Sequence, residues 1–195
     1  MRDSINKTAI AFLSTFPPRQ CGIATFTLDL ATAIDKLDFS DIKTKIIAVN
    51  EHKQKPNYTN GILYQIDNKK IEYYVEAAKL VNGSEDIKAV SIQHEFKLYG
   101  SDYGENLLLF LKAIKKPVVT TFHAVLPYPS HQRKYIVQAI AKKSDIVVVM
   151  SKVAVEILSR DYFVPKAKIK LIPHGIHDVS YEFNRNYRRE LSFED

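Results

Sequence analysis

The stretch "TAIAFLSTFPPRQCGIATFTLDLATAI", residues 8–34, passes from a short apolar run into a helical pattern through an unusual loop. Its first part, Thr8–Leu13, is short and apolar, as expected of a buried strand. From Ile23 onwards, apolar residues recur at three- and four-residue steps, which predicts an amphipathic helix. Between the two lie Pro17-Pro18-Arg19-Gln20-Cys21-Gly22 in place of a short polar turn. The stretch therefore predicts a strand–loop–helix unit with a stiff loop.

The same unit recurs along the chain. Further short runs rich in β-branched residues predict strands at 44–49, 62–66, 88–92, 118–122, 145–150 and 168–172. Helical stripes lie between most of them, and Asp102 and Ser151 are placed as helix N-caps. Only Glu51–Gly61 is polar throughout and predicts a loop. The alternation predicts an α/β fold with a doubly wound, mainly parallel seven-stranded sheet and helices on both faces.

Composition limits the classes of protein. With 195 residues, 46% of them hydrophobic, the chain can bury a full core. The net charge of +6 comes from 28 basic residues scattered among 22 acidic ones, so we expect no nucleic-acid partner. The single cysteine fits a reducing compartment, and no run approaches the roughly 20 apolar residues of a membrane span. We expect a cytoplasmic protein.

Polar and glycine residues gather after the predicted strands, at the carboxyl edge where doubly wound sheets bind ligands. After the first strand, Gly22 and Thr25 open a helix whose N-terminus could take a phosphate, with Arg19 as a mobile counter-charge. A rigid loop that only ends the strand explains the same residues equally well, because no phosphate-loop motif is present.

Histidines follow the later strands. Gln93-His94-Glu95 follows the fourth strand, and a hydrogen-bonded structural cluster is the simpler interpretation of these residues. His123 ends a buried strand, where its ring could reach a sugar hydroxyl or a phosphate oxygen. The spacing does not require a metal ion, and we expect none.

Five stretches together resemble the N-terminal domain of retaining family-four glycosyltransferases of the GT-B fold, in a mannosyltransferase-like bacterial branch. They are "FPPRQCGIATFTLDL", "VSIQHEFKLYGSDYGENLLLFL", "KPVVTTFHAVL", "SDIVVVMS" and "KIKLIPHGI". They occur in the order of the family and cover about residues 8–178. Lys97 and Ser101 depart from the pattern, because relatives often have glycine at these positions.

The resemblance implies roles for the residues at the carboxyl edge. His123 would contact the transferring sugar, and Gln93, His94 and Glu95 would shape the acceptor side. Arg19, Gly22 and Thr25 would lie near the donor phosphates, and His174 and Gly175 would border the donor site. The donor would be a GDP- or UDP-sugar, used as substrate without a further cofactor, and the acceptor a glycan or a lipid-linked compound. Lys134, Lys142 and Lys143 could contact a membrane surface, although a solvated helix face explains them better.

The resemblance also implies a domain organisation. Residues 1–178 would form the GT-B N-terminal domain, and residues 179–195 a connector towards a C-terminal donor-binding domain that the sequence does not contain. This half alone is then expected to be almost inactive. Two alternatives are a non-catalytic binding module of the same fold and a GT-B epimerase, for which Glu95 alone is thin support.

Overall fold

The computed structural model describes residues 8–37, 41–58 and 61–176. Seven strands form a single sheet in the order β3-β2-β1-β4-β5-β6-β7, and all six pairings are parallel. The strands are β1 Thr8–Ser14, β2 Ile42–Asn50, β3 Ile62–Asp67, β4 Ile87–His94, β5 Val118–Phe122, β6 Ile146–Val149 and β7 Ile169–Leu171. The predicted α/β fold is confirmed, and no strand boundary differs from its prediction by more than two residues.

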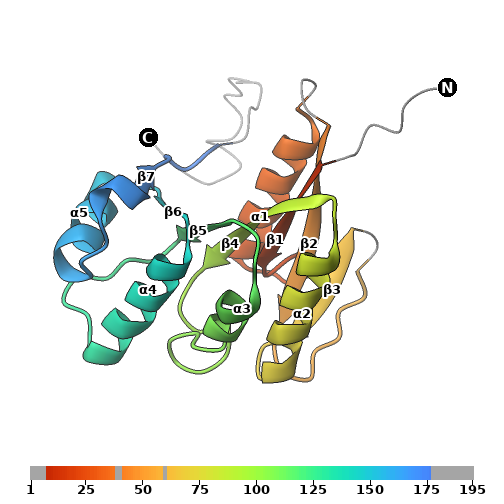
Figure 1. The fold of residues 1–195 in the computed structure, drawn as a ribbon, viewed down its shortest axis with the longest axis horizontal. Helices are drawn as coiled ribbons and strands as arrows, with labels where there is room; N and C mark the ends of the chain where they lie inside the picture. The colour runs from red at the N-terminus through yellow and green to blue at the C-terminus, as the bar shows by residue number, and fades with distance from the viewer. Residues whose placement is uncertain (1–7, 38–40, 59–60, 177–195) are drawn as a thin grey trace, which may run out of the picture.

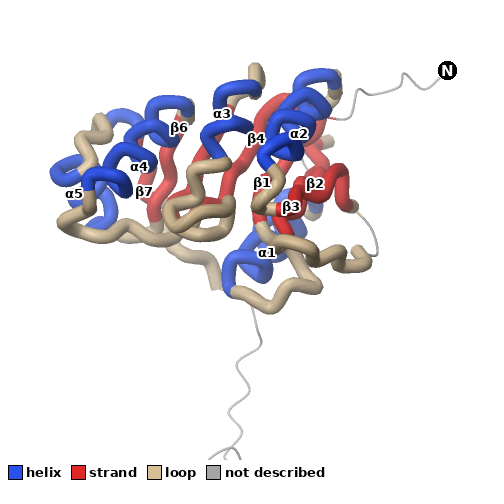
Figure 2. Tube along the Cα trace, turned by 90° about the horizontal axis from the view of Figure 1, so that it is seen from below, coloured by secondary structure: helices blue, strands red, loops and turns tan. Residues whose placement is uncertain are grey.

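Helices connect most of the strands and cover both faces of the sheet (Figure 1). They are α1 Gly22–Asp35, α2 Ile71–Gly83, α3 Leu107–Ala113, α4 His131–Lys143 and α5 Lys152–Asp161, with a short 3-10 helix at Lys166–Lys168. Helix α1 lies on one face, and α2, α3 and α4 lie together on the other (Figure 2). No helix in the described ranges is long and apolar enough to cross a membrane.

Each face of the sheet has its own hydrophobic core. The larger core lies under α2, α3 and α4 and includes the fully buried Tyr74, Tyr99 and Phe110. A smaller core joins α1 to β1 and β2. Here α1 buries the small residues Ala24 and Ala31, so the helix packs close to the strands at the point where the first loop begins.

Two capping predictions have different outcomes. Ser151 caps α5, since its hydroxyl accepts a hydrogen bond from the backbone N–H of Ala154 at 3.1 Å, as predicted. The prediction for Asp102 is wrong, because α3 begins five residues later, at Leu107. Ser101 and Gly104 both have positive φ angles, of 54° and 75°, which no helical turn can contain.

Strand order reverses at β1. Its neighbours are β2 on one side and β4 on the other, so the connections that leave β1 and arrive at β4 run in opposite directions. In open α/β sheets, the crevice at such a reversal is where ligands bind. The loops after β1 and β4 carry Arg19 and Glu95, respectively, to this place.

Candidate functional site

The loop after β1 is fixed at the start of α1. Cys21 is the N-cap: its sulfur accepts a hydrogen bond from the backbone N–H of Ala24 at 3.4 Å and lies 3.3 Å from the Thr15 hydroxyl. Thr25 is exposed, and its hydroxyl donates to the Cys21 carbonyl at 3.5 Å. An added Cβ on Gly22 would meet nothing within 4 Å. The glycine is therefore not required by close packing, and it leaves the start of α1 open.

Arg19, expected as a mobile counter-charge, lies in an ion pair. Its guanidinium forms an ion pair with Glu51, the residue after β2, with an Nη2–Oε1 distance of 2.9 Å. The other terminal nitrogen, Nη1, is buried and has no hydrogen-bond partner among the described residues. A buried donor without a partner is uncommon, and it leaves Arg19 able to bind one more acceptor.

His123 is oriented by a buried amide. Its Nε2 lies 2.9 Å from Oε1 of Gln93, a fully buried residue of β4. Because the amide oxygen can only accept, the ring proton is on Nε2, and Nδ1 remains an acceptor. Burial, with a smaller contribution from His174, lowers the pKa of His123 to about 4, so the ring is neutral at pH 7.

Phe26, on α1, connects the two ends of the site. Its ring packs edge-on against His123 and His174, with centroid distances of 4.8 and 5.2 Å. His174 and Gly175 are exposed, and His174 Nδ1 lies 2.9 Å from the Gly175 carbonyl oxygen. Sequence analysis treated the apolar residues from Ile23 onwards only as one face of a helix, and it missed this contact of Phe26.

His94 occupies the opposite side of the sheet from His123. Its ring is 0% exposed and packs against Phe96, Tyr99 and Phe122 in the larger core. Neither ring nitrogen has a partner among the described residues, and burial, with a smaller effect of His123, lowers its pKa to about 3. The ring has no surface for a ligand, which argues against the predicted substrate contact. Its backbone carbonyl still positions the site, because it accepts the N–H of His123 at 2.9 Å.

A polar pocket of about 550 Å³ opens beside these residues. We call it the Arg19–Lys97 pocket, and its polar lining consists mainly of Arg19, Glu51, Asn68, Lys69, Glu95 and Lys97. Burial raises the pKa of Glu95, while the charges of Lys97 and Arg19 oppose this effect. Sequence analysis named Arg19 near the donor phosphates and Glu95 on the acceptor side, but it missed the residues after β3. The rule that polar residues gather at the carboxyl edge could have found Asn68.

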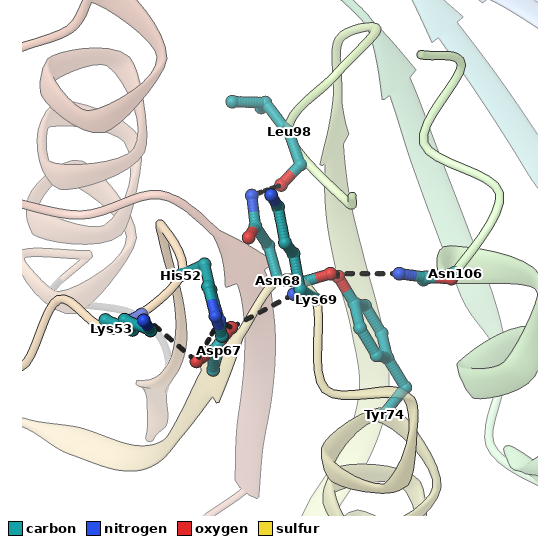
Figure 3. Close-up of polar contacts among 8 residues, drawn as sticks. All are labelled: His52, Lys53, Asp67, Asn68, Lys69, Tyr74, Leu98 and Asn106. Atoms are coloured by element: carbon teal, nitrogen blue, oxygen red, sulfur yellow. Dashed lines mark hydrogen bonds and ion pairs between the residues drawn. The ribbon is translucent and has the colours of Figure 1, made fainter. Parts of the chain in front are cut away.

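Asn68, which lines this pocket, forms hydrogen bonds with the loop after β4 (Figure 3). Its side-chain amide donates to the backbone carbonyl of Leu98 at 3.4 Å. Its backbone carbonyl accepts from the side-chain amide of Asn106 at 2.9 Å and from the Tyr74 hydroxyl at 3.1 Å. The preceding Asp67 accepts hydrogen bonds from His52 and from backbone N–H groups (Figure 3). The segment after β3 is thus connected to the loop after β4 through hydrogen bonds and not only by packing.

No group of three or more histidine, cysteine or acidic side chains in the described ranges is arranged to hold a metal ion. Neutral imidazole, arginine, lysine and carboxylate groups instead face one sheet edge. Such groups bind polar or anionic ligands. The fold defines an α/β domain of the Rossmann type.

The family model of glycosyltransferase family 4 matches residues 22–179. The chain therefore belongs to glycosyltransferase family 4. A comparison with curated protein sequences finds no significant match.

Two solved structures share the fold. A glycosyltransferase from Rickettsia africae is 18% identical, with a TM-score of 0.63, over 97% of this chain and 51% of that one. A sucrose-phosphate synthase structure from Thermosynechococcus elongatus is also 18% identical, with a TM-score of 0.55, over 86% of this chain and 90% of that one. The chain thus spans about half the length of the Rickettsia enzyme.

Proposed function

We propose that the chain is the acceptor-side half of a retaining hexosyltransferase, which transfers mannose or glucose from a GDP- or UDP-sugar to a glycan or lipid-linked acceptor. Membership of glycosyltransferase family 4 supports the reaction class. The active enzyme would need a second domain to bind most of the nucleotide, and the 195 residues alone would transfer little or no sugar. The mannosyltransferase-like branch and the cytoplasmic location are parts of the same proposal.

The geometry of His123 is the observation that carries this proposal. Gln93 fixes the proton on Nε2 at a distance of 2.9 Å, so Nδ1 can accept a hydrogen bond from a sugar hydroxyl. The low pKa, about 4, keeps the ring uncharged at neutral pH. His123 would therefore orient the sugar by hydrogen bonding and would not act as a cationic acid.

Leaving-group stabilisation would come from other groups. The described part of this half presents no obvious nucleophile at the site, so transfer with retention would depend on electrostatic stabilisation of the leaving phosphate. The open start of α1, at Gly22 and Thr25, could contribute backbone N–H groups, together with the second domain. His174 and Gly175 would border the donor from the last strand.

Nucleotide-sugar binding tests the proposal. We expect GDP-mannose or UDP-glucose to shift the NMR signals of the His123 ring in the 195-residue chain, and His123→Ala to abolish weak binding. His131→Ala is the matched control, since His131 is exposed at the start of α4 and should bind as the parent does. If His123→Ala binds nucleotide sugars as the parent does, the proposed role is refuted. If the chain alone transfers hexose at an ordinary enzyme rate, the two-domain account is refuted.

A further inference from the structure

Lys97 has a backbone conformation that its side chain disfavours. Its φ angle is +74°, in the left-handed region. Glycine adopts this conformation without steric cost, whereas a residue with a Cβ is strained there. Lys97 is also exposed and lines the Arg19–Lys97 pocket. Strained residues that line a ligand site are often there for function, because the fold gains nothing from the strain.

The surrounding contacts hold this conformation. Leu98, the next residue, accepts a hydrogen bond from the Asn68 side chain at 3.4 Å. Gly100 also has a positive φ, +73°, and an added Cβ there would lie 2.3 Å from the Asn68 carbonyl oxygen. The loop after β4 is therefore packed tightly on Asn68, which constrains the backbone on the C-terminal side of Lys97.

Charge in the pocket favours an anion. Arg19, Lys69 and Lys97 provide three positive charges, and Glu51 and Glu95 provide two negative ones. Glu51 is already bound to Arg19, whereas no described residue forms an ion pair with Lys69 or Lys97.

Two lining residues have atoms that lack partners. Arg19 Nη1, a donor, and Asn68 Oδ1, an acceptor, are both buried without a hydrogen bond in the described part of the chain. A phosphate oxygen is an acceptor that suits the first, and a hydroxyl group is a donor that suits the second. Both atoms are closed to solvent in this structure, so a phosphorylated compound with hydroxyl groups would reach them only after the two side chains turn.

We propose that the Arg19–Lys97 pocket binds a phosphate group on the acceptor, with Arg19, Lys69 and Lys97 as its ligands and Asn68 accepting a neighbouring hydroxyl. This rests on the proposed function, because it makes the hydroxyl-bearing phosphate compound the acceptor for the hexose. Glu95, which lines the pocket, follows β4, and Gln93 near the end of the same strand contacts His123, so the pocket and the proposed sugar position share the carboxyl edge of the sheet.

Calorimetric titration of the 195-residue chain tests the phosphate site without any sugar transfer. The probes are inorganic phosphate, glucose 6-phosphate, glucose as the neutral match, and undecaprenyl phosphate in non-ionic detergent. We expect phosphate-bearing probes to bind and glucose to bind far more weakly. Tighter binding of glucose 6-phosphate would indicate a soluble acceptor, and tighter binding of the polyprenyl phosphate would indicate a lipid-linked one.

Lys97→Gly separates binding from folding. Glycine relieves the strain, so the melting temperature should be equal to or above that of the parent, while phosphate binding weakens about tenfold or more, or 1.4 kcal/mol. Lys97→Arg should keep binding. Lys79→Met, which removes an exposed lysine from α2, is the control and should bind as the parent does.

The proposal is overturned if no phosphate probe binds, or if Lys97→Gly binds phosphate as tightly as the parent. Failure of the proposed function has a different result. In that case, phosphate binding would still depend on Lys97, but no nucleotide sugar would bind in a manner that depends on His123.

Discussion

Replacing His94 by leucine should flatten the pH dependence of stability. Burial, with a smaller contribution from His123, lowers the pKa of His94 to about 3, below the ordinary value of 6.5 that applies in the unfolded chain. Between these values the unfolded chain binds a proton and the folded chain does not. Stability is therefore fully present above pH 6.5 and is lost as the pH falls towards the folded pKa.

The expected size of this effect at pH 5 follows mainly from the ordinary pKa of 6.5 in the unfolded chain. It depends on the 1.5 pH units between 6.5 and 5, and only on the folded pKa lying well below 5. At about 1.36 kcal/mol per unit, His94 alone should remove about 2 kcal/mol of stability between neutral pH and pH 5. His123, whose pKa is also lowered, to about 4, adds a loss in the same direction in both the parent and the variant.

Urea unfolding at pH 7 and pH 5 measures the difference. The parent should lose about 2 kcal/mol more than His94→Leu over this interval. At pH 7 the variant should be nearly as stable as the parent, or more so, because leucine has a similar volume and removes two buried nitrogens without partners. Tyr135→Phe alters an exposed ring and should follow the parent curve. Equal losses in His94→Leu and the parent would refute the reasoning.

Two further substitutions test the loop after β4, and a third, in α2, is their control. Gly100→Ala should lower the melting temperature by several degrees, since its Cβ would lie 2.3 Å from the Asn68 carbonyl oxygen and its φ is +73°. Gly83→Ala, with nothing within 4 Å and a helical position, should instead raise stability by about 0.5–1 kcal/mol in the same thermal scan, and the opposite order would contradict this account. Tyr99→Phe removes a hydroxyl that lies 3.0 and 2.7 Å from the carbonyls of Leu13 and Gln93, so urea unfolding should show a loss of about 1–2 kcal/mol. An unchanged midpoint would show that this hydroxyl does not join β1 to β4.

Strands could be predicted because parallel strands buried on both faces are nearly continuous apolar runs. The start of α3 could not, because Tyr103 lies in phase with the helical stripe that begins at Leu107. The turn that excludes Tyr103 from the helix depends on a positive φ at Ser101. A serine in the sequence does not indicate a positive φ, because serine seldom adopts that conformation.

The side of the sheet on which each site residue lies was present in the sequence. Successive strand residues point to opposite faces, so Val90, Ile92 and His94 share the face of the larger core. Gln93 lies with Ser91 on the other face, and its amide donates to the Ser91 hydroxyl at 3.1 Å. This alternation predicts a buried His94 and a Gln93 directed towards α1, although a match to the histidine alone gives no such direction.

The conformation of Lys97 could not be read from the sequence, and this makes it informative. A lysine in the left-handed region costs about 1 kcal/mol relative to the ordinary one, and glycine would avoid that cost. The loop is tied at Leu98 and Gly100, so its conformation would persist with glycine at position 97. The fold therefore needs a positive φ at this position but not a lysine. The lysine adds a positive charge to the lining of the Arg19–Lys97 pocket. The proposed phosphate ligand would interact favourably with that charge.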